Sequence, residues 1–288
     1  MRKINVLLLA GLLVALNVLA WQEVFILSQP RYLKVDFLSV GQGDSEFIET
    51  PEGHQILIDG GPDSTVSTKL GQLLPSWDKT IDVVILTHPE KDHMAGILDI
   101  LQRYKVDYFV WTGIIRDDAG NKRLNTLLQA VQTQQQTKII TARAGQKIKA
   151  GNVLIDVLFP FESLNGKELK DTSNDTSIVS RLIYGNNSFL FTGDIGSVAE
   201  KQLVDSEQDI ISDVLKIAHH GSKYSTSNLF LAVVKPEYAA IEVGKNSYGH
   251  PTAEVLQRLE NFGITIKRTD KDGDVIFLSD GNNIVLSN

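Results

Sequence analysis

The spacing of apolar residues differs between the start of the chain and the rest. The uncharged run Ile4–Ala20 follows two basic residues, and at about 1.5 Å of rise per residue it approaches the roughly 30 Å thickness of a hydrocarbon core. Trp21 follows where an interfacial aromatic residue is expected. We therefore predict that residues 1–28 form one hydrophobic helix, which serves as a membrane anchor or as a signal segment.

Either interpretation places the remaining residues, 29–288, outside the cytoplasmic membrane, because basic residues that flank an apolar run stay on the cytoplasmic side. The apolar run is longer than a typical signal core, which favours an uncleaved anchor and a single-pass membrane protein. If the segment is cleaved instead, the domain is secreted.

From Tyr32 onward, short strands alternate with amphipathic helices. Strands are predicted at Tyr32–Leu38, Ser45–Glu49, Gln55–Ile58, Ile81–Leu86, Val153–Leu158, Ile178–Tyr184, Phe189–Phe191, Val214–Ile217, Tyr238–Val243, Ile264–Lys267, Val275–Leu278 and Asn283–Leu286. Helices are predicted at Thr65–Leu74, Met94–Tyr104, Leu124–Gln135, Val198–Val204, Leu229–Val234 and Thr252–Phe262. Both halves of the chain run strands first and then alternate strand and helix. The pattern therefore predicts an α/β fold of two sheet layers with helices outside.

Composition and charge restrict the chemistry. The 288 residues include no cysteine, which excludes disulfides, a thiol nucleophile and a thiolate metal site. The chain has 28 Lys and Arg against 35 Asp and Glu, a net charge of −7. This balance argues against a large surface for polyanions, although it leaves room for a metal site that handles one phosphate at a time.

Four of the six histidines lie in two clusters that follow apolar strands. The first cluster, THPEKDHMAG, contains His88, Glu90, Asp92 and His93 between a predicted buried strand and a predicted helix. The carboxyl end of a strand that opens into a helix is where α/β proteins place ligand-binding groups. Imidazole and carboxylate donors together suit a divalent cation such as Zn²⁺ or Mn²⁺.

Three further strand ends carry similar residues. Asp194 lies in FTGDIGS, Asp59 in LIDGG, and the adjacent His219 and His220 in KIAHHGSK. Because adjacent side chains point in different directions, we expect one histidine of the pair to bind metal and the other to support the site. A single acidic residue at a strand end is often only a helix cap, but four such ends favour a metal centre.

At these residues the sequence resembles the metallo-β-lactamase-fold hydrolases. It is more closely similar to the extracytoplasmic hydrolase domain of the ComEC family of competence DNA-uptake proteins. The blocks that carry this resemblance are VDFLSVGQGDS (Val35–Ser45), ILIDGG (Ile56–Gly61), LTHPEKDHMAG (Leu86–Gly96), SNDTSIV (Ser173–Val179), FLFTGD (Phe189–Asp194), LKIAHHGS (Leu215–Ser222) and NSYGHP (Asn246–Pro251). The resemblance implies an αβ/βα four-layer sandwich with a metal centre at one edge of the sheets.

The resemblance also implies a ligand set for one or two divalent ions, Zn²⁺ or Mn²⁺. That set is His88, Glu90, Asp92, His93, Asp175, Asp194 and His219, with His220 as the alternative to His219. Glu90 stands where the superfamily motif has its second histidine, and Asn174 and Asp175 stand in the region of a third-motif histidine. Both departures make the first metal site richer in oxygen, which favours Mn²⁺ over zinc. They also favour a site with one bound ion over a site with two.

The ligands alone suggest a mechanism. A bound dication lowers the pKa of its water and so supplies hydroxide, which Asp92 would orient. Donors to the substrate or leaving group are expected among four residues near the second histidine cluster, namely His220, Ser222, Lys223 and His250. Supporting contacts around the ligands are expected from Asp59, Asn174, Ser222 and Asn246.

Three functions are compatible with these residues. The resemblance favours a metal-dependent phosphodiesterase or nuclease that acts on DNA outside the cytoplasmic membrane. One alternative is a metallohydrolase of small esters or envelope metabolites, and another is a catalytically weak accessory module of DNA uptake. Because one helix cannot conduct DNA, a role in uptake predicts a separate channel protein as partner, beside the membrane itself.

Overall fold

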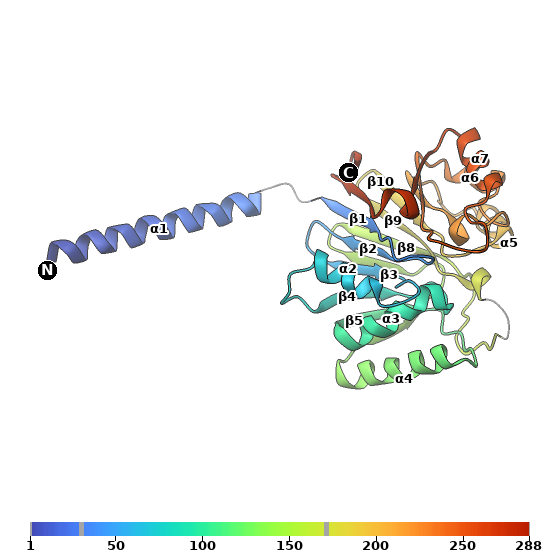
Figure 1. Ribbon diagram of the computed structural model, residues 1–288, viewed down its shortest axis with the longest axis horizontal. Helices are drawn as coiled ribbons and strands as arrows, with labels where there is room; N and C mark the ends of the chain where they lie inside the picture. Colours follow the sequence, from blue (N-terminus) through green and yellow to red (C-terminus); the bar gives the residue numbers. More distant parts are fainter. Residues whose placement is uncertain (1, 29–31, 170–172, 288) are drawn as a thin grey trace. The chain divides into compact units, whose positions relative to one another are not determined.

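The computed structural model describes residues 2–28, 32–169 and 173–287 (Figure 1). The chain divides into two units, Met1–Arg31 and Tyr32–Asn288. The first unit contains helix α1 (Arg2–Ser28), and its side chains from 8 to 22 are exposed. Within the described ranges, no helix combines enough length and apolar character to cross a membrane, so the predicted anchor is not supported. The predicted domain boundary at residue 29 lies outside the described residues.

The second unit contains two sheets. The first has the order β15 (Ile284–Ser287), β14 (Val275–Ser279), β1 (Leu33–Phe37), β2 (Glu46–Glu49), β3 (Gln55–Ile58), β4 (Thr80–Ile85), β5 (Lys105–Trp111) and β6 (Lys138–Thr141). The second has the order β13 (Thr265–Arg268), β12 (Tyr238–Ile241), β11 (Val214–Lys216), β10 (Asn187–Phe191), β9 (Val179–Tyr184), β8 (Val153–Phe159) and β7 (Lys147–Ala150). Strands β3 to β6 are parallel, and so are β10 to β13.

Helices cover the outer face of each sheet (Figure 1). The first sheet packs against α2 (Thr65–Leu73), α3 (Lys91–Arg103) and α4 (Ala119–Gln134) through one apolar cluster. The second packs against α5 (Ser197–Asp205), α6 (Asn228–Val234) and α7 (Ala253–Asn261) through another. The short elements are η1 (Asn174–Thr176), η2 (Ala218–Gly221) and α8 (Thr269–Asp272). These layers confirm the predicted αβ/βα sandwich.

A third apolar cluster fills the space between the sheets. Phe277 lies at its centre, with ring centroids 5.9 Å from Phe37 and 6.1 Å from Phe189 in edge-to-face arrangements. Val214 of β11 and Ala240 of β12 face the same space from the second sheet. Burial of these side chains is the main stabilising contribution that holds the two sheets together.

The structure differs from the predicted elements in three respects. Helix α3 begins at Lys91, not Met94, because its first turn is polar and the apolar pattern starts one turn late. Strands β5, β6 and β7 were not predicted; β5 follows α3 directly, with no Gly or Pro between them. The last two strands, β14 and β15, join β1 in the first sheet, so the sheets are not two separate halves of the chain.

Candidate metal centre

The predicted site residues follow parallel strands that end at one edge of the sandwich. Asp59 follows β3, and His88 follows the adjacent strand β4. Asp194 follows β10, and His219 and His220 follow the adjacent strand β11. The carboxyl ends of parallel neighbours lie together, which explains why residues so far apart in sequence meet here.

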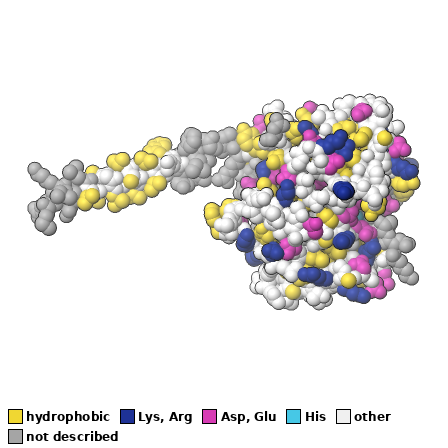
Figure 2. Space-filling model, viewed as in Figure 1, with side chains coloured by type: hydrophobic (Ala, Val, Ile, Leu, Met, Phe, Trp, Pro, Cys, Tyr) yellow, Lys and Arg dark blue, Asp and Glu magenta, His cyan; other side chains and the backbone are white. Residues whose placement is uncertain are grey.

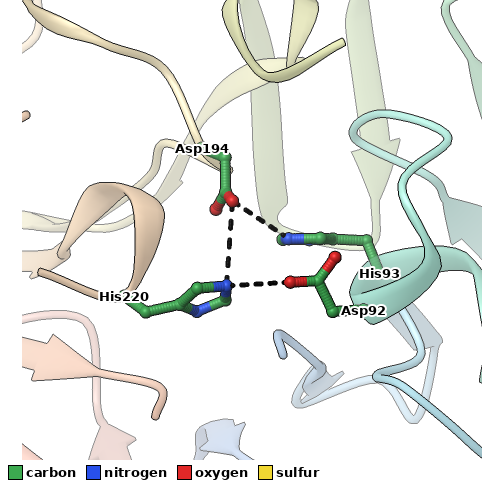
Figure 3. A group of neighbouring side chains, drawn as sticks. All are labelled: Asp92, His93, Asp194 and His220. Atoms are coloured by element: carbon green, nitrogen blue, oxygen red, sulfur yellow. Dashed lines mark hydrogen bonds and ion pairs between the residues drawn. The ribbon is translucent and has the colours of Figure 1, made fainter. Parts of the chain in front are cut away.

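Four side chains converge at this edge, from α3 and from the loops after β10 and β11 (Figure 3). Ligand atoms of Asp92, His93, Asp194 and His220 all lie within 4.8 Å of one another. Asp194 Oδ2 is 3.4 Å from His93 Nε2 and 3.7 Å from His220 Nε2, while Asp92 Oδ2 is 3.3 Å from His220 Nε2. Two imidazoles and two carboxylates that meet in this way suit a divalent cation.

The adjacent histidines of η2 have different environments. Both have left-handed backbone conformations, with φ of 52° for His219 and 53° for His220, a strained arrangement typical of functional sites. His220 is buried in the four-residue group, whereas His219 is 34% exposed with its Nε2 3.8 Å from Asp194 Oδ2. The Nδ2 amide of Asn174 lies 3.2 Å from His219 Nε2, on the side of the η1 turn. The structure therefore groups His220, and not His219, with the other potential ligands.

His88 and Asp59 lie behind this group. The Nδ1 atom of His88 is 3.0 Å from the Thr87 hydroxyl and 3.2 Å from that of Ser177, and its buried Nε2 has no partner among the described residues. Burial, and then the neighbouring His93, lower the pKa of His88 to about 3, so this imidazole is neutral.

Asp59 holds both His93 and Thr87. Its Oδ2 atom is 2.7 Å from His93 Nδ1 and accepts the Thr87 hydroxyl at 2.6 Å, while its Oδ1 accepts the Thr87 backbone N–H at 2.7 Å. A carboxylate behind a histidine in this way fixes which ring nitrogen points toward a metal. The predicted supporting role of Asp59 is consistent with these contacts.

The electrostatics favour positive charge at the site. Burial opposes the charged form of His220, but Asp194 and then Asp44 outweigh it and raise the pKa of His220 to about 10. The pKa of buried His93 is likewise raised, by Asp194, Asp44 and Asp59. A divalent cation would replace the charge of these two imidazolium groups among the same carboxylates. Together with the partnerless His88 Nε2, this shows that the residues fit a divalent metal.

Beneath the site lie four buried ionisable residues that the sequence analysis did not identify, namely Asp44, Glu46, Lys216 and Glu242. Lys216 Nζ forms an ion pair with Asp44 and lies 3.9 Å from Asp194 Oδ1. Asp44 Oδ1 is 3.1 Å from His220 Nδ1, which also lies 2.9 Å from the backbone oxygen of Glu242. Asp44 comes directly after the glycine-containing loop Gly41–Gly43, which follows a predicted strand. The other acidic site residues also come shortly after strands, so this position in the sequence could have identified Asp44.

Two predicted oxygen ligands have other partners. Glu90 forms an ion pair with Arg116 and accepts the backbone N–H of Ser173 at 2.9 Å. Asp175 accepts the backbone N–H of Gly196 at 2.8 Å. Neither carboxylate belongs to the groups of the described residues that could hold a metal ion.

A cleft of about 440 Å³ opens onto the four-residue group. Its lining combines acidic, imidazole and amide side chains with one arginine and one tyrosine: Gln42, Glu90, Asp92, Arg116, Asn174, Asp194, His219, His220, Tyr248 and His250. Of the predicted donors, His250 thus lies in the cleft, with its ring centroid 5.5 Å from that of His219. Lys223 is exposed, and its Nζ lies 5.1 Å from the ring centroid of Tyr224.

Ser222 and Asn246 have structural contacts. Ser222 is buried, and its backbone N–H donates to the carbonyl of His219 at 2.9 Å. Asn246 closes the loop before α7, since its Nδ2 donates to the Gly244 and His250 carbonyls at 2.9 Å each. These contacts shape the loops on which the cleft residues lie.

A family model for the metallo-beta-lactamase superfamily matches residues 38–244. The chain belongs to this superfamily. Among solved structures, the metallo-β-lactamase fold protein YhfI from Bacillus subtilis has a TM-score of 0.57 at 15% identity, covering 86% of this chain and 100% of that protein. The metallo hydrolase Igni18 from Ignicoccus hospitalis has a TM-score of 0.55 at 19% identity, covering 85% and 98%. These two likenesses show the fold.

Several curated relatives of this metallo-β-lactamase fold chain are competence proteins of the ComEC family. ComE operon protein 3 of Bacillus subtilis (strain 168) is 32% identical over 262 residues, which make up 84% of this chain and 32% of the relative. Competence protein ComA of Neisseria gonorrhoeae is 31% identical over 243 residues, 82% of this chain and 31% of the relative. The chain thus spans about a third of the length of these relatives.

Proposed function

We propose that this protein is a metal-dependent phosphodiesterase that cuts DNA. The observation that carries the proposal is the convergence of Asp92, His93, Asp194 and His220, of which all but the buried His93 line a cleft. The similarity to competence proteins supports a role in DNA uptake and DNA as the substrate.

The four converging side chains would hold the ion, and His88 Nε2 would extend the site toward a second one. A bound divalent cation lowers the pKa of water toward 7 and neutralises charge on the attacked phosphoryl oxygen. Asp59 holds the His93 ring, and Asp44 and the Glu242 carbonyl hold the His220 ring, so that both turn Nε2 toward the carboxylate of Asp194.

The remaining roles belong to residues on the cleft wall. Asp92 lines the cleft and, at 37%, is the most exposed of the four converging side chains, so it can accept a proton or a hydrogen bond from an attacking water. His219 and His250 lie together on the wall and can donate a proton to the leaving oxygen. Lys223, predicted as a donor to the substrate or leaving group, is not among the residues that line the cleft and receives no role.

A single nucleotide, not an extended duplex, fits the surroundings of the cleft. Tyr248 lines the cleft and is 74% exposed, so one face of its ring is available for stacking against a nucleobase. The chain as a whole is acidic, with 28 Lys and Arg against 35 Asp and Glu, and basic and acidic side chains are interspersed on the face drawn in Figure 2. Because extended duplex binding requires many neutralised phosphates, these features favour a single-stranded substrate held by a few contacts.

The small cleft also favours a second candidate, the hydrolysis of small esters. Both functions would use the same metal ligands, so the two differ in the substrate that the cleft walls accept. Tyr248 distinguishes the two functions, because a nucleobase can stack on the tyrosine ring and gain binding energy, whereas a small acyl ester has no ring to stack.

The test uses the full chain, stripped of metal and reloaded with Mn²⁺ or Zn²⁺. It is incubated with circular single-stranded DNA and, separately, with p-nitrophenyl acetate. We expect metal-dependent cutting of the circles that the Asp92→Asn, His220→Asn double variant lacks. Asp205→Asn, which neutralises an exposed carboxylate on α5, serves as the matched control and should cut normally. Ester hydrolysis without DNA cutting would contradict the proposal and support the second candidate.

A further inference from the structure

Arg116 introduces a permanent positive charge into a cleft whose other charged side chains are carboxylates and imidazoles. Among the described residues that line the cleft it is the only lysine or arginine. It lies after β5, on the segment that pairs with Glu168 through the bridge at Ile115. We propose that Arg116 binds a phosphate of the substrate and that Glu90 positions it for this task. The inference rests on the proposed function and names the residue that selects phosphate-bearing substrates.

The guanidinium group is held on one side and, within the part of the chain that the structure describes, makes no hydrogen bond on the other. Nη1 forms an ion pair with Glu90 and donates to the Ser173 hydroxyl at 3.3 Å, and Nε lies 3.4 Å from Asp118 Oδ2. Nη2 makes none of the hydrogen bonds found among the described residues, although a guanidinium carries five N–H donors. A guanidinium that is held in this way and still has free donors is suited to a phosphate oxygen.

Glu90 explains why this arginine stays in place. Its Oε1 atom takes part in the Arg116 ion pair and also accepts the Ser173 backbone N–H at 2.9 Å and the Ser173 hydroxyl at 3.1 Å. The carboxylate is thereby engaged, and among the described residues it does not group with Asp92 and His93 as a potential metal ligand, although it lies in the same segment. At the position where the superfamily motif has a histidine, this chain therefore has a glutamate that holds the guanidinium group of Arg116.

The Arg116–Glu90 pair also affects which substrates the cleft attracts. Asp92 and Asp194 line the same cleft, and their carboxylates oppose the approach of a phosphodiester wherever no cation offsets them. Arg116 adds an attraction that does not depend on metal occupancy, and its side chain is only 18% exposed, so solvent screens it incompletely. A neutral ester gains nothing from this charge, whereas a nucleotide does.

The experiment compares Arg116→Gln, Arg116→Lys and Glu90→Gln with the wild type. Arg123→Gln, an exposed arginine on α4, is the matched control. Affinity for thymidine 5′-monophosphate is measured by calorimetry on the full chain, with and without Mn²⁺. We expect Arg116→Gln to weaken binding about 10- to 100-fold in both conditions, because charge-assisted hydrogen bonds are lost. Arg116→Lys should recover part of the loss, and Arg123→Gln should bind as the wild type does.

Metal content gives an independent measurement. Glu90→Gln and the Glu90→Gln, Arg116→Gln double variant should take up as much Mn²⁺ as the wild type, since Glu90 is engaged by Arg116. The double variant leaves no unpaired charge at this position, so it keeps the comparison valid if Arg116→Gln alone does not fold. Loss of metal from Glu90→Gln, or nucleotide affinity within twofold of the wild type in Arg116→Gln, would overturn the inference.

The proposed function and this inference can fail separately. If the wild type cuts no DNA but binds the nucleotide through Arg116, the nuclease proposal fails and the inference stands. If it cuts DNA while Arg116→Gln changes neither KM nor nucleotide affinity, the inference fails and the nuclease proposal stands.

Discussion

The space between the two sheets is apolar along most of the strands and charged at the end that carries the site. On β11, Val214 faces this space within the apolar cluster, and Lys216, two residues further, faces it beside Asp44. The same change from apolar to charged occurs at the end of β12, where Ala240 belongs to the apolar cluster and Glu242, two residues further, lies near Asp44 and Glu46. All of these side chains are buried, so the two ends differ in chemistry and not in exposure.

This difference separates what stabilises the fold from what prepares the site. Apolar burial contributes roughly 25 cal/mol per Å² and needs no partner, whereas buried charges are costly unless they are paired. At the charged end Lys216 pairs with Asp44, and burial followed by Asp44 raises the pKa of Glu242 to about 8, so this carboxyl is mostly protonated at neutral pH. We conclude that these residues are arranged to hold His220 and Asp194 and that their stabilising contribution is secondary.

The largest expected effect comes from the charged end. Asp194→Asn removes the carboxylate that both His93 and His220 face. We expect kcat/KM on single-stranded DNA to fall about 10³-fold, because a metal supplies several kcal/mol and each 1.36 kcal/mol is tenfold in rate. Metal content and melting temperature are measured in parallel. Added Mn²⁺ should raise the melting temperature of the wild type and leave that of the variant unchanged; equal shifts in both would break the distinction between the two ends.

At the apolar end, Phe277→Ala should act on stability alone. Phe277 is fully buried between Phe37 and Phe189, and the truncation of a buried Phe costs about 3–5 kcal/mol. Urea unfolding gives the free-energy change, and kcat/KM is corrected for the folded fraction. We expect the corrected activity to stay within about twofold of the wild type. A loss of metal affinity in this variant would show that the two ends are coupled.

Replacing the buried cation tests how the charged end is held together. Lys216→Met should destabilise the fold by about 3–5 kcal/mol, since it removes the ammonium group that forms an ion pair with the buried Asp44. Asp44→Asn added to Lys216→Met should recover part of this loss, because the double variant removes both members of the ion pair. A double-mutant cycle by chemical denaturation measures the coupling, and additive effects would mean that the pair does not act as a unit.

The smallest expected effect lies at the exposed edge of the cleft. Tyr248→Ala should raise KM for single-stranded DNA by a factor that corresponds to about 1–3 kcal/mol, the contribution of one stacked base. Tyr248→Phe keeps the ring and should behave as the wild type does. Turnover of bis(p-nitrophenyl) phosphate, which carries no nucleobase, provides the comparison. If Tyr248→Ala impairs the turnover of both substrates equally, the tyrosine supports the loop and does not recognise a base.

The elements and the site were predictable from the chain to different degrees. The strands that lead into Asp59, His88, Asp194 and His220 are apolar runs bounded by turns, so the sequence pattern alone located them. Helix α3 was predicted one turn too short because its first turn is polar, and that turn contains Asp92 and His93. The pairing of β14 with β1 depends on long-range contacts that local periodicity does not encode.

The sequence by itself determined the two sheet layers with helices outside, because the spacing of apolar residues carries that information, and the family resemblance of its motifs implied the αβ/βα order and a metal centre. Only the tertiary structure decided which ligand atoms meet. In the structure His220, and not His219, groups with Asp194. Glu90 forms an ion pair with Arg116, and Lys216 forms one with Asp44 beneath the site. The physical reason is that side-chain direction depends on backbone conformation and on partners from distant strands, such as the left-handed turn at the two histidines and Asp44 more than a hundred residues away.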